Sequence, residues 1–548
     1  MKYLLGLLLT LVFLSCKKDE KQINDTNANE VADDISAIST KDFREFKVLD
    51  SKLISNEVIW EDINTQLEDF KEATYKALKP LILNQDIPSL QKSVSEGKLS
   101  YESLTKFYLF RIRKYDREND LSLNSVISLN PNAIAAARQK DRELLNKKAK
   151  HPIFGMPILL KDNINAKGIP TTAGALALKN NETEDAFITS QLKSQGAIIL
   201  GKANLSEWAY FFCGSCPSGY SAIGGQTLNP YGRRIIDTGG SSSGSGVAVA
   251  ANFCAAAIGS ETAGSILSPA SQNSAVGLKP TIGVLSRTGI VPISSTLDTP
   301  GPISRFVVDN AIVFDAMKGY DQADFKSVEP KLDIKNYYEN LNANAVKGKR
   351  FGAFKELMKD TLYMNAIGLL KQQGAEIVEI SEEKVDLPDF IRLLNLDMKV
   401  DLANYFENYS NKELPYKTIE DIIEFNLKDS LLAMPYGQRL FEGVSKDSSS
   451  KEEFEAIKNT LKTNGKVFFD TPMKVEQLDA ILSINNYHAA EAAVAEYPAL
   501  TVPMGYTKEG VPKGLTFIST PLSEKQLLQW AYSYEQASNM RVSPKDYN

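Results

Sequence analysis

The sequence predicts one large α/β domain in which a mixed or parallel β-sheet is covered by helices. Apolar, strand-like segments alternate with helical segments between about residues 125 and 204, which is the pattern of strands joined by crossover helices. Residues 150–310 contain no stretch of linker-like composition. A single domain is therefore favoured, although the chain length alone would suggest roughly three or four.

The individual elements follow from their patterns of apolar residues. The segment Val247–Ile258 is rich in alanine on every side and lies between two Gly/Ser runs, so we expect it to be a helix that must be buried to be stable. The other expected elements, in chain order, are strands at 125–130, 158–160 and 197–204, a helix at 189–195, and paired strands at 499–506 and 514–520. Residues from about 320 to 480 are charged and mainly helical in pattern.

Composition narrows the possible functions. The chain has 62 basic and 68 acidic residues, so it offers no basic footprint for nucleic acid. A hydrophobic content of 43% suits a globular enzyme or ligand-binding protein. His151 and His488 are its only histidines, so a metal site is not expected. Cys213 and Cys216 form a CxxC motif, for which a disulfide and free thiols both remain open.

The amino-terminal segment has the features of an export signal. Residues 1–15 combine an early lysine with an apolar run that is too short to span a bilayer. Because a small residue precedes Cys16, the segment resembles a lipoprotein signal, and Cys16 is expected to be lipidated; an ordinary signal peptide with an incidental cysteine is the alternative. Residues 16–50 are polar and suit a flexible tether before a folded body at 51–548. We therefore expect a membrane-anchored lipoprotein of the cell envelope, in the periplasm or outer membrane.

Three side chains could perform covalent chemistry. Lys161 ends the apolar segment PILLK, where desolvation would lower its pKa and make it a base; a structural ion pair, for example with Asp162, is the alternative. Ser241 and Ser265 lie in the two Gly/Ser runs, and either could be a turn serine. A nucleophilic serine needs a base, and with so little histidine in the chain a Ser–Lys arrangement is the economical solution.

Several motifs together resemble the amidase signature family of serine hydrolases. They are GMPILLKDNI, PTTAG, GAIILGKANLSEWA, GGQTLNPY, GGSSSGSGVAVAAN, GSETAGSILSPA, GLKPTIGVLSRTGIVPISSTLDTPGPISR and YPALTVPMGY. The resemblance extends from about residue 86 to 538, with a signature core at about 150–310 and a divergent region at about 320–480. It implies a single amidase-signature domain with a mixed sheet covered by helices on both faces. The segments SETAGSIL, NLSEWA and GGQTLNPY are most similar to the peptide-amidase-like branch.

The resemblance also implies a Ser–cisSer–Lys triad and hydrolysis of a carboxamide. Lys161 would be the base, Ser241 the proton relay on a cis peptide, and Ser265 the nucleophile that forms the acyl-ester. The N–H groups of the turn that contains Thr262, Ala263 and Gly264 would bind the oxyanion. No cofactor or metal is implied, the oligomeric state is open, and the substrate would be a small-molecule or peptide amide.

Other interpretations remain. Gly240–Gly244 also fits a G-x-S-x-G elbow, with Ser242 as nucleophile and His488 as its base. A lipoprotein that binds amides or peptides without catalysis is a second alternative. An amidotransferase component that acts on aminoacyl-tRNA is a third. Family members of that third kind commonly have arginine two residues after the nucleophile, where this chain has Leu267, and this difference opposes it.

Overall fold

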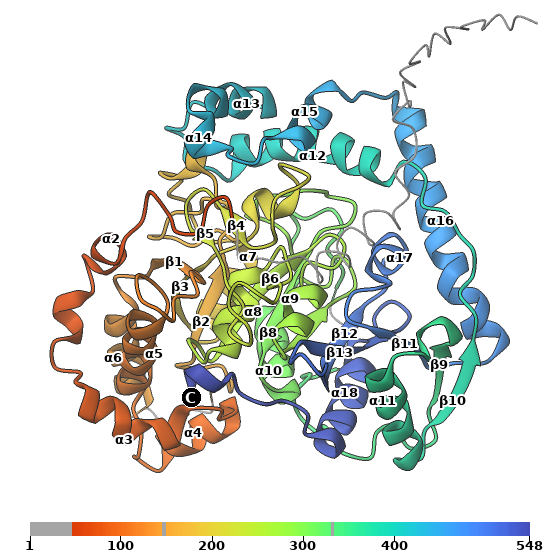
Figure 1. The fold of residues 1–548 in the computed structure, drawn as a ribbon, viewed down its shortest axis with the longest axis horizontal. Helices are drawn as coiled ribbons and strands as arrows, with labels where there is room; N and C mark the ends of the chain where they lie inside the picture. Colours follow the sequence, from red (N-terminus) through yellow and green to blue (C-terminus); the bar gives the residue numbers. More distant parts are fainter. Residues whose placement is uncertain (1–45, 145–149, 330–333) are drawn as a thin grey trace, which may run out of the picture.

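The computed structural model describes residues 46–144, 150–329 and 334–548, so the expected signal peptide, Cys16 and most of the tether lie outside the described residues. An eleven-stranded mixed β-sheet forms the centre of the molecule (Figure 1). In sheet order its strands are β1 (Val126–Leu129), β3 (Ile198–Ala203), β2 (Pro157–Lys161), β6 (Ala256–Glu261), β8 (Thr299–Ser304), β7 (Val276–Lys279), β12 (Ala499–Tyr506), β13 (Pro512–Ile518), β11 (Ala480–Ile484), β9 (Arg350–Phe354) and β10 (Glu376–Ile380). A two-stranded sheet is formed by β4 (Tyr220–Ser221) and β5 (Gly225–Gln226).

The register of the central strands brings the site segments together. Strand β2 pairs in parallel with β3 on one side and with β6 on the other, with Leu160 opposite Ile258. Strand β6 pairs antiparallel with β8, where Glu261 lies opposite Thr299. Because parallel neighbours end at the same edge of a sheet, the ends of β2 and β6 are adjacent. Lys161 and the turn after Glu261 therefore share one edge.

Helices cover both faces of the sheet, as the sequence predicts. The helices α8 and α9 contact each other and pack on the central strands, whereas α10, α18 and α11 form another connected group on the sheet. The α-helices are α2 (Asn56–Trp60), α3 (Glu72–Ile82), α4 (Ile87–Ser95), α5 (Tyr101–Tyr115), α6 (Ala133–Leu144), α7 (Phe187–Ser194), α8 (Ser243–Ala250), α9 (Leu267–Gln272), α10 (Val307–Met317), α11 (Thr361–Gln372), α12 (Phe390–Asn408), α13 (Ile419–Lys428), α14 (Ser430–Ala433), α15 (Arg439–Lys446), α16 (Lys451–Val475), α17 (Ala489–Val494) and α18 (Glu524–Ser538).

The expected helix at Val247–Ile258 is wrong in its second half. Helix α8 ends at Ala250, and after a turn at Asn252, whose φ is 57°, the chain enters β6. A run of small residues has no helical or strand period, so its sequence does not show where a helix should stop. Residues from Ala256 onward lie between β2 and β8, and there a strand is favoured over a helix because it forms hydrogen bonds with both neighbouring strands. The other expected strands, the helix at 189–195 and the pairing of β12 with β13 are confirmed.

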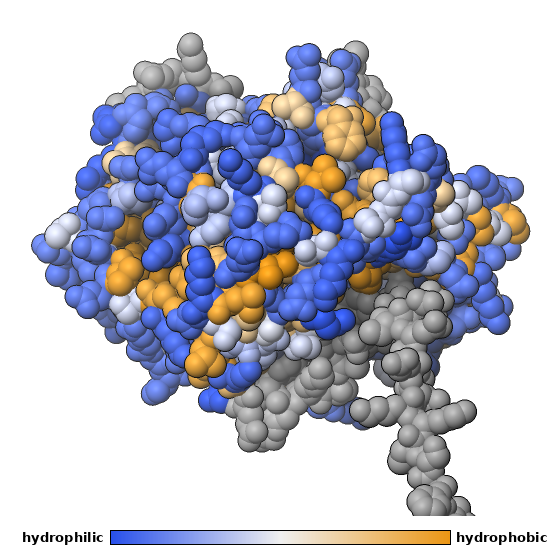
Figure 2. All heavy atoms as spheres, turned by 90° about the horizontal axis from the view of Figure 1, so that it is seen from above, coloured by the Kyte–Doolittle hydropathy of each residue, from blue (hydrophilic) through white to orange (hydrophobic). Residues whose placement is uncertain are grey.

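The divergent region, at about residues 320–480, contributes two strands to the central sheet and a group of helices outside it. Strands β9 and β10 extend the sheet at one end, while α12 to α15 lie together at the top of Figure 1. Seen from that side, the surface is mainly hydrophilic and its hydrophobic residues gather in separate patches (Figure 2).

Cys213 and Cys216 are joined by a disulfide, which answers the question left open by the sequence. In the described part of the chain, no helix has the length and apolar character needed to cross a membrane.

Candidate active site

Lys161 is the last residue of β2 and is fully buried. Its Nζ lies 2.7 Å from Ser241 Oγ, 2.9 Å from Ser260 Oγ and 3.0 Å from the Ser260 carbonyl oxygen. Burial lowers the pKa of Lys161 to about 7, while the negative charges of Asp298 and Glu261 act in the opposite direction. An amine without a direct carboxylate partner, surrounded by hydroxyls and a carbonyl, can lose its proton near neutral pH. The expected alternative of an ion pair with Asp162 is wrong, because Asp162 instead pairs with Lys202.

Ser241 follows a cis peptide bond with Gly240 and precedes α8. Its side chain is fully buried against Lys161, and its carbonyl oxygen accepts a hydrogen bond of 3.0 Å from the Ser206 N–H. The position before it leaves little room for a side chain, since a Cβ on Gly240 would lie 2.7 Å from Ser206 Oγ. The side chains packed around Gly240 and the hydrogen bond to Lys161 hold Ser241 Oγ at the lysine.

Ser265 lies in the turn between β6 and α9 and, unlike Ser241, is partly exposed. Its carbonyl oxygen accepts a 3.2 Å hydrogen bond from the Ser242 N–H, so this turn rests against the segment that carries the cis peptide. Glu261 Oε2 accepts hydrogen bonds from the N–H groups of Ile266 and Leu267, at 2.6 and 2.9 Å. These contacts place the turn of the nucleophile candidate beside the segment that carries Ser241 and hold the following residues in place.

The turn that carries the expected oxyanion donors is held by buried contacts. Gly264 has a φ of 91°, which disfavours any residue with a side chain. Thr262 Oγ1 donates to Asp298, whose other carboxylate oxygen accepts from the N–H groups of Ile293 and Ser294 at 2.8 and 3.0 Å. Ala263 lies between Thr262 and Gly264 in the same turn. The residues predicted for the oxyanion site are therefore contiguous in a constrained loop beside Ser265.

Sequence reasoning missed three residues at this site. Ser260 contacts Lys161 through both its hydroxyl and its carbonyl, and Asn163 Nδ2 donates to the Ser260 hydroxyl at 2.9 Å. Asp298 supports Thr262. All three lie within the quoted motifs, but nothing in their spacing indicates which residues they contact. A buried serine and a buried asparagine beside a lysine are recognisable only from the packed structure.

The histidines do not take part in the site. His151 Nε2 lies 3.1 Å from Asp315, and His488 lies between Ser483 and Glu382, at 2.7 and 3.2 Å. Ser242, the elbow candidate, instead exchanges hydrogen bonds with the backbone of Ser260 and is fully buried. The alternative interpretation, in which Ser242 is a nucleophile with His488 as its base, is therefore wrong. Within the described ranges, no three His, Cys, Asp or Glu side chains are grouped as ligands for a metal ion.

Comparison with known proteins agrees with this geometry. A family model described as Amidase matches residues 103–528, most of the folded body. The chain belongs to the amidase signature family. A protein of Arabidopsis thaliana named "Probable amidase" is 35% identical over 475 residues, which cover 84% of this chain and 91% of that protein. A glutamyl-tRNA(Gln) amidotransferase component of Microcystis aeruginosa is 32% identical over 483 residues, covering 82% of this chain and 96% of that protein.

Solved structures show the same fold. An amidase family protein from Bacillus anthracis str. Ames superposes with a TM-score of 0.86 at 39% identity, over 91% of this chain and all of that one. The native peptide amidase from Stenotrophomonas maltophilia superposes with a TM-score of 0.79 at 37% identity, over 84% of this chain and 98% of that one. The fold class predicted from the sequence is thereby confirmed, and amide hydrolysis is the activity of the family in general terms.

Proposed function

We propose that this amidase hydrolyses a carboxamide to a carboxylic acid and ammonia or an amine, through an acyl-ester on Ser265. The observation that carries the proposal is the 2.7 Å contact between the buried Lys161 Nζ and the Ser241 hydroxyl. A neutral amine has two N–H groups and one lone pair. The Ser260 carbonyl can only accept, and if the Ser260 hydroxyl accepts the second N–H, the lone pair is left for the Ser241 proton.

The chemical steps then follow from this proton path. Lys161 takes the proton of Ser241 Oγ as Ser241 takes the proton of Ser265 Oγ, and Ser265 Oγ forms a bond with the carbonyl carbon. The electron pair of the C=O bond moves to the oxygen, which the N–H groups of Thr262, Ala263, Gly264 and Ser265 stabilise. The intermediate collapses with cleavage of the C–N bond, and Ser241 gives its proton to the leaving nitrogen as it takes a proton back from Lys161. Water then cleaves the acyl-ester by the reverse path and releases the acid.

Labelling with a fluorophosphonate tests this assignment directly, because the reagent needs only an activated serine. Wild-type protein is expected to be labelled on Ser265, and both Ser265→Ala and Lys161→Ala should abolish labelling. Ser242→Ala tests the elbow alternative, and it should keep most of the labelling, because Ser242 supports the Ser260 backbone but takes no part in the proposed proton transfers. Labelling that persists in Ser265→Ala but is lost in Ser242→Ala would reverse the assignment. A folded wild-type protein that is never labelled would favour the non-catalytic binding protein.

The substrate class is proposed from the relatives. The peptide amidase from Stenotrophomonas maltophilia is similar over most of this chain, which supports carboxamides of peptides as first candidates. Relatives named as amidotransferase components keep transfer of ammonia from glutamine as a second candidate. Release of ammonia from a panel of peptide carboxamides, free amides and glutamine separates the two, and Leu267 in place of the usual arginine favours the carboxamides.

A further inference from the structure

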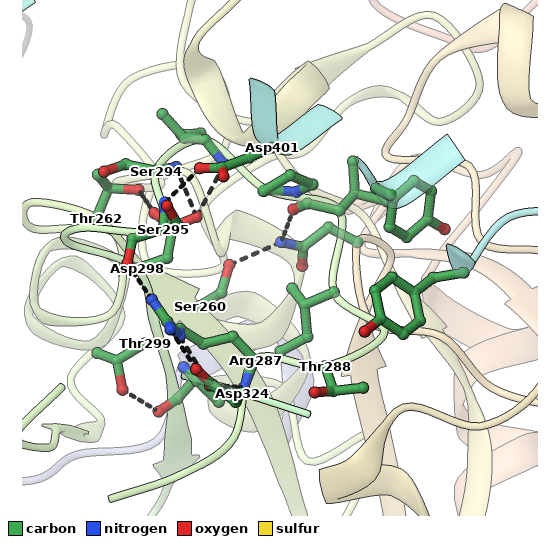
Figure 3. Close-up of a pocket in the computed structure, with 18 of the residues that line it drawn as sticks. Ser260, Thr262, Arg287, Thr288, Ser294, Ser295, Asp298, Thr299, Asp324 and Asp401 are labelled. Carbon is green, nitrogen blue, oxygen red and sulfur yellow. Dashed lines mark hydrogen bonds and ion pairs between the residues drawn. The ribbon is translucent and has the colours of Figure 1, made fainter. Parts of the chain in front are cut away.

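A cavity of about 120 Å³ adjoins the proposed catalytic residues. Ser260 and Thr262 lie in its wall, so it reaches both the partner of Lys161 and the first residue of the oxyanion turn. Another part of the wall comes from α12, which carries Asp401, and Asp401 lies beside Ser294 and Ser295 (Figure 3). A volume of about 120 Å³ exceeds the roughly 10–15 Å³ that a single water molecule needs. The cavity therefore has room for a functional group of a substrate.

The charges around the cavity are unequally compensated. Arg287 forms an ion pair with Asp324 through two nitrogens and also donates to the Ser295 carbonyl, so its charge is already matched. Asp298 accepts three hydrogen bonds. Asp401 differs, because it is held by Ser295 alone, whose N–H donates to Oδ2 at 2.6 Å. No Lys, Arg or His of the described residues forms an ion pair with Asp401.

The side-chain oxygen of Asn163, a residue that lines the same cavity, accepts no hydrogen bond from the described residues. Asn163 is only 2% exposed, and its Nδ2 donates to Ser260 Oγ and to the Val291 carbonyl at 2.9 and 3.3 Å. The carbonyl partner can only accept, which assigns the nitrogen to that side. Asn163 Oδ1 is then a buried acceptor with no hydrogen bond. Buried polar atoms are nearly always paired in folded proteins, so an unpaired one in a cavity wall indicates a missing donor.

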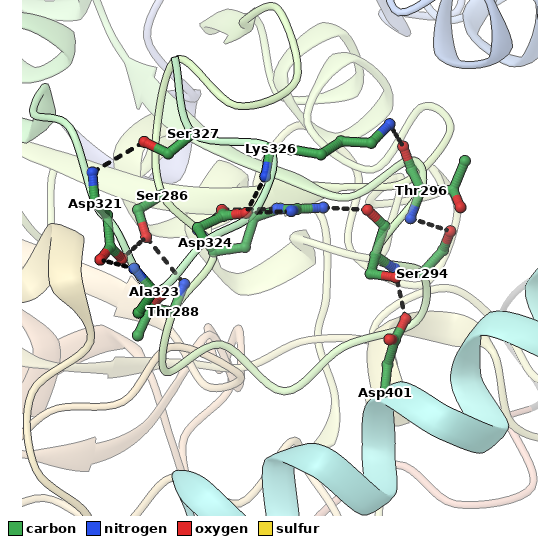
Figure 4. A network of polar contacts seen from close by, with 12 residues as sticks. Ser286, Thr288, Ser294, Thr296, Asp321, Ala323, Asp324, Lys326, Ser327 and Asp401 are labelled. Atoms are coloured by element: carbon green, nitrogen blue, oxygen red, sulfur yellow. Dashed lines mark hydrogen bonds and ion pairs between the residues drawn. The ribbon is translucent and has the colours of Figure 1, made fainter. Parts of the chain in front are cut away.

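Asp401 also stands where this cavity meets a larger one. A cavity of about 310 Å³ shares Ser295, Phe325 and Asp401 with the first. Figure 4 shows Asp401 facing the loop that contains Ser294 and Thr296. Phe325 is 76% exposed and lines both cavities, which offers an apolar surface along the passage.

The charged groups of the second cavity leave Asp401 unmatched. The Lys326 and Lys462 ammonium groups both pair with Glu496, and Lys458 pairs with Glu455. Burial and the neighbouring carboxylate of Asp397 raise the pKa of Asp401 to about 7. The Arg287 guanidinium in the wall of the smaller cavity also interacts electrostatically with Asp401, but its direct ion pair is with Asp324.

We propose that the smaller cavity is a subsite for a cationic group of the amide substrate, an ammonium or guanidinium, bound by Asp401 and Asn163. Asn163 presents an acceptor without a donor and Asp401 a carboxylate without a cation, and a cationic donor satisfies the first while it neutralises the second. The apolar stem that carries the cation passes Phe325. This inference rests on the proposed function, because the subsite is defined by its position beside the amide-cleaving residues.

The test compares N-acetyl-lysinamide with N-acetyl-norleucinamide, which has a similar stem without the charge, by release of ammonia. Wild-type enzyme should prefer the lysine amide, and Asp401→Asn should lower the ratio of the two kcat/KM values by about 10- to 100-fold, as expected for a lost hydrogen bond between charged groups. Because a general loss of activity lowers both kcat/KM values equally, it does not change their ratio. Asp401→Glu keeps the charge and should restore part of the preference. Glu407→Gln is the matched control, because Glu407 is exposed on the same helix and lies outside both cavities.

Calorimetry with Ser265→Ala protein separates this inference from the proposed function. Binding of N-acetyl-lysinamide that weakens in Ser265→Ala/Asp401→Asn supports the subsite even if no amide is hydrolysed. Hydrolysis of both amides at equal rates by the wild type would overturn the subsite and leave the proposed function intact. A preference for the lysine amide that Asp401→Asn does not change would also overturn it.

Discussion

The pH dependence of amide cleavage should report the ionisation of Lys161. Burial moves the pKa of this lysine from its ordinary 10.5 to about 7. At pH 7 about half of the enzyme would then contain the neutral amine, whereas a pKa of 10.5 would leave roughly one molecule in 3000, a difference of about 4 kcal/mol in the availability of the base. Because only the neutral amine accepts a proton, kcat/KM should fall about tenfold per pH unit below pH 7 and level off above it.

The assay is ammonia release from an uncharged carboxamide between pH 5 and 9, at constant ionic strength and with substrate well below KM. An uncharged substrate is needed because the pKa of Asp401 is also raised to about 7, and a cationic substrate would report both groups. Asp401→Asn should therefore leave the inflection in the same place. A profile that stays flat from pH 7 to pH 5, or an inflection that disappears in Asp401→Asn, would refute the assignment of Lys161 as the base.

The remaining predictions concern the oxyanion turn and the amino terminus. Gly264→Ala should reduce turnover more than tenfold and destabilise the fold by about 1–3 kcal/mol, because a Cβ at its φ of 91° would lie 3.0 Å from Asn486 Nδ2. Gly510→Ala is the control, since Gly510 has a similar φ of 84° but open space around it. In urea unfolding this control should lose stability, whereas its turnover should not change. Thr262→Val should cost about 1–3 kcal/mol and lower kcat, because it leaves a partly buried carboxylate oxygen of Asp298 without its donor. Thr262→Ser should retain both stability and kcat, and equal kcat values in the two variants would contradict this role. Cys16→Ser should move the protein from the membrane fraction to the soluble fraction on fractionation of the producing cell, and an unchanged distribution would argue against lipidation.

The candidate site was largely predictable from local sequence. Glycine and serine runs at 239–246 and 259–265 supply the left-handed turn and the hydroxyls within short stretches of chain, where backbone requirements are visible in residue type. The cis peptide and the roles of the three residues were implied by the family resemblance. The apolar run before Lys161 indicates a buried strand and hence a desolvated amine. Both inferences depend only on neighbours in sequence, and the structure places Lys161, Ser241 and the Ser265 turn together.

Contacts between distant segments were not predictable. Ser260 is 99 residues from Lys161, and Asp298 is 36 residues from Thr262. Asp401 enters the cavity wall from α12, in the region where the motifs of the family end. Which polar atoms become buried together, and which remain without a partner, depends on how the whole sheet and its helices pack.

The Val247–Ile258 segment shows which properties follow from the local sequence and which depend on tertiary packing. Its composition established that it is buried, because small apolar residues on all sides have no solvent-facing side. It did not establish whether the backbone is helix or strand, since Ala and Gly fit both. The sheet determines the conformation, because residues from Ala256 onward form hydrogen bonds with β2 and β8. The residues before Asn252 form helix α8, which begins two residues after Ser241. The sequence by itself determined the chemical groups and their burial, whereas the tertiary structure decided which of them face one another.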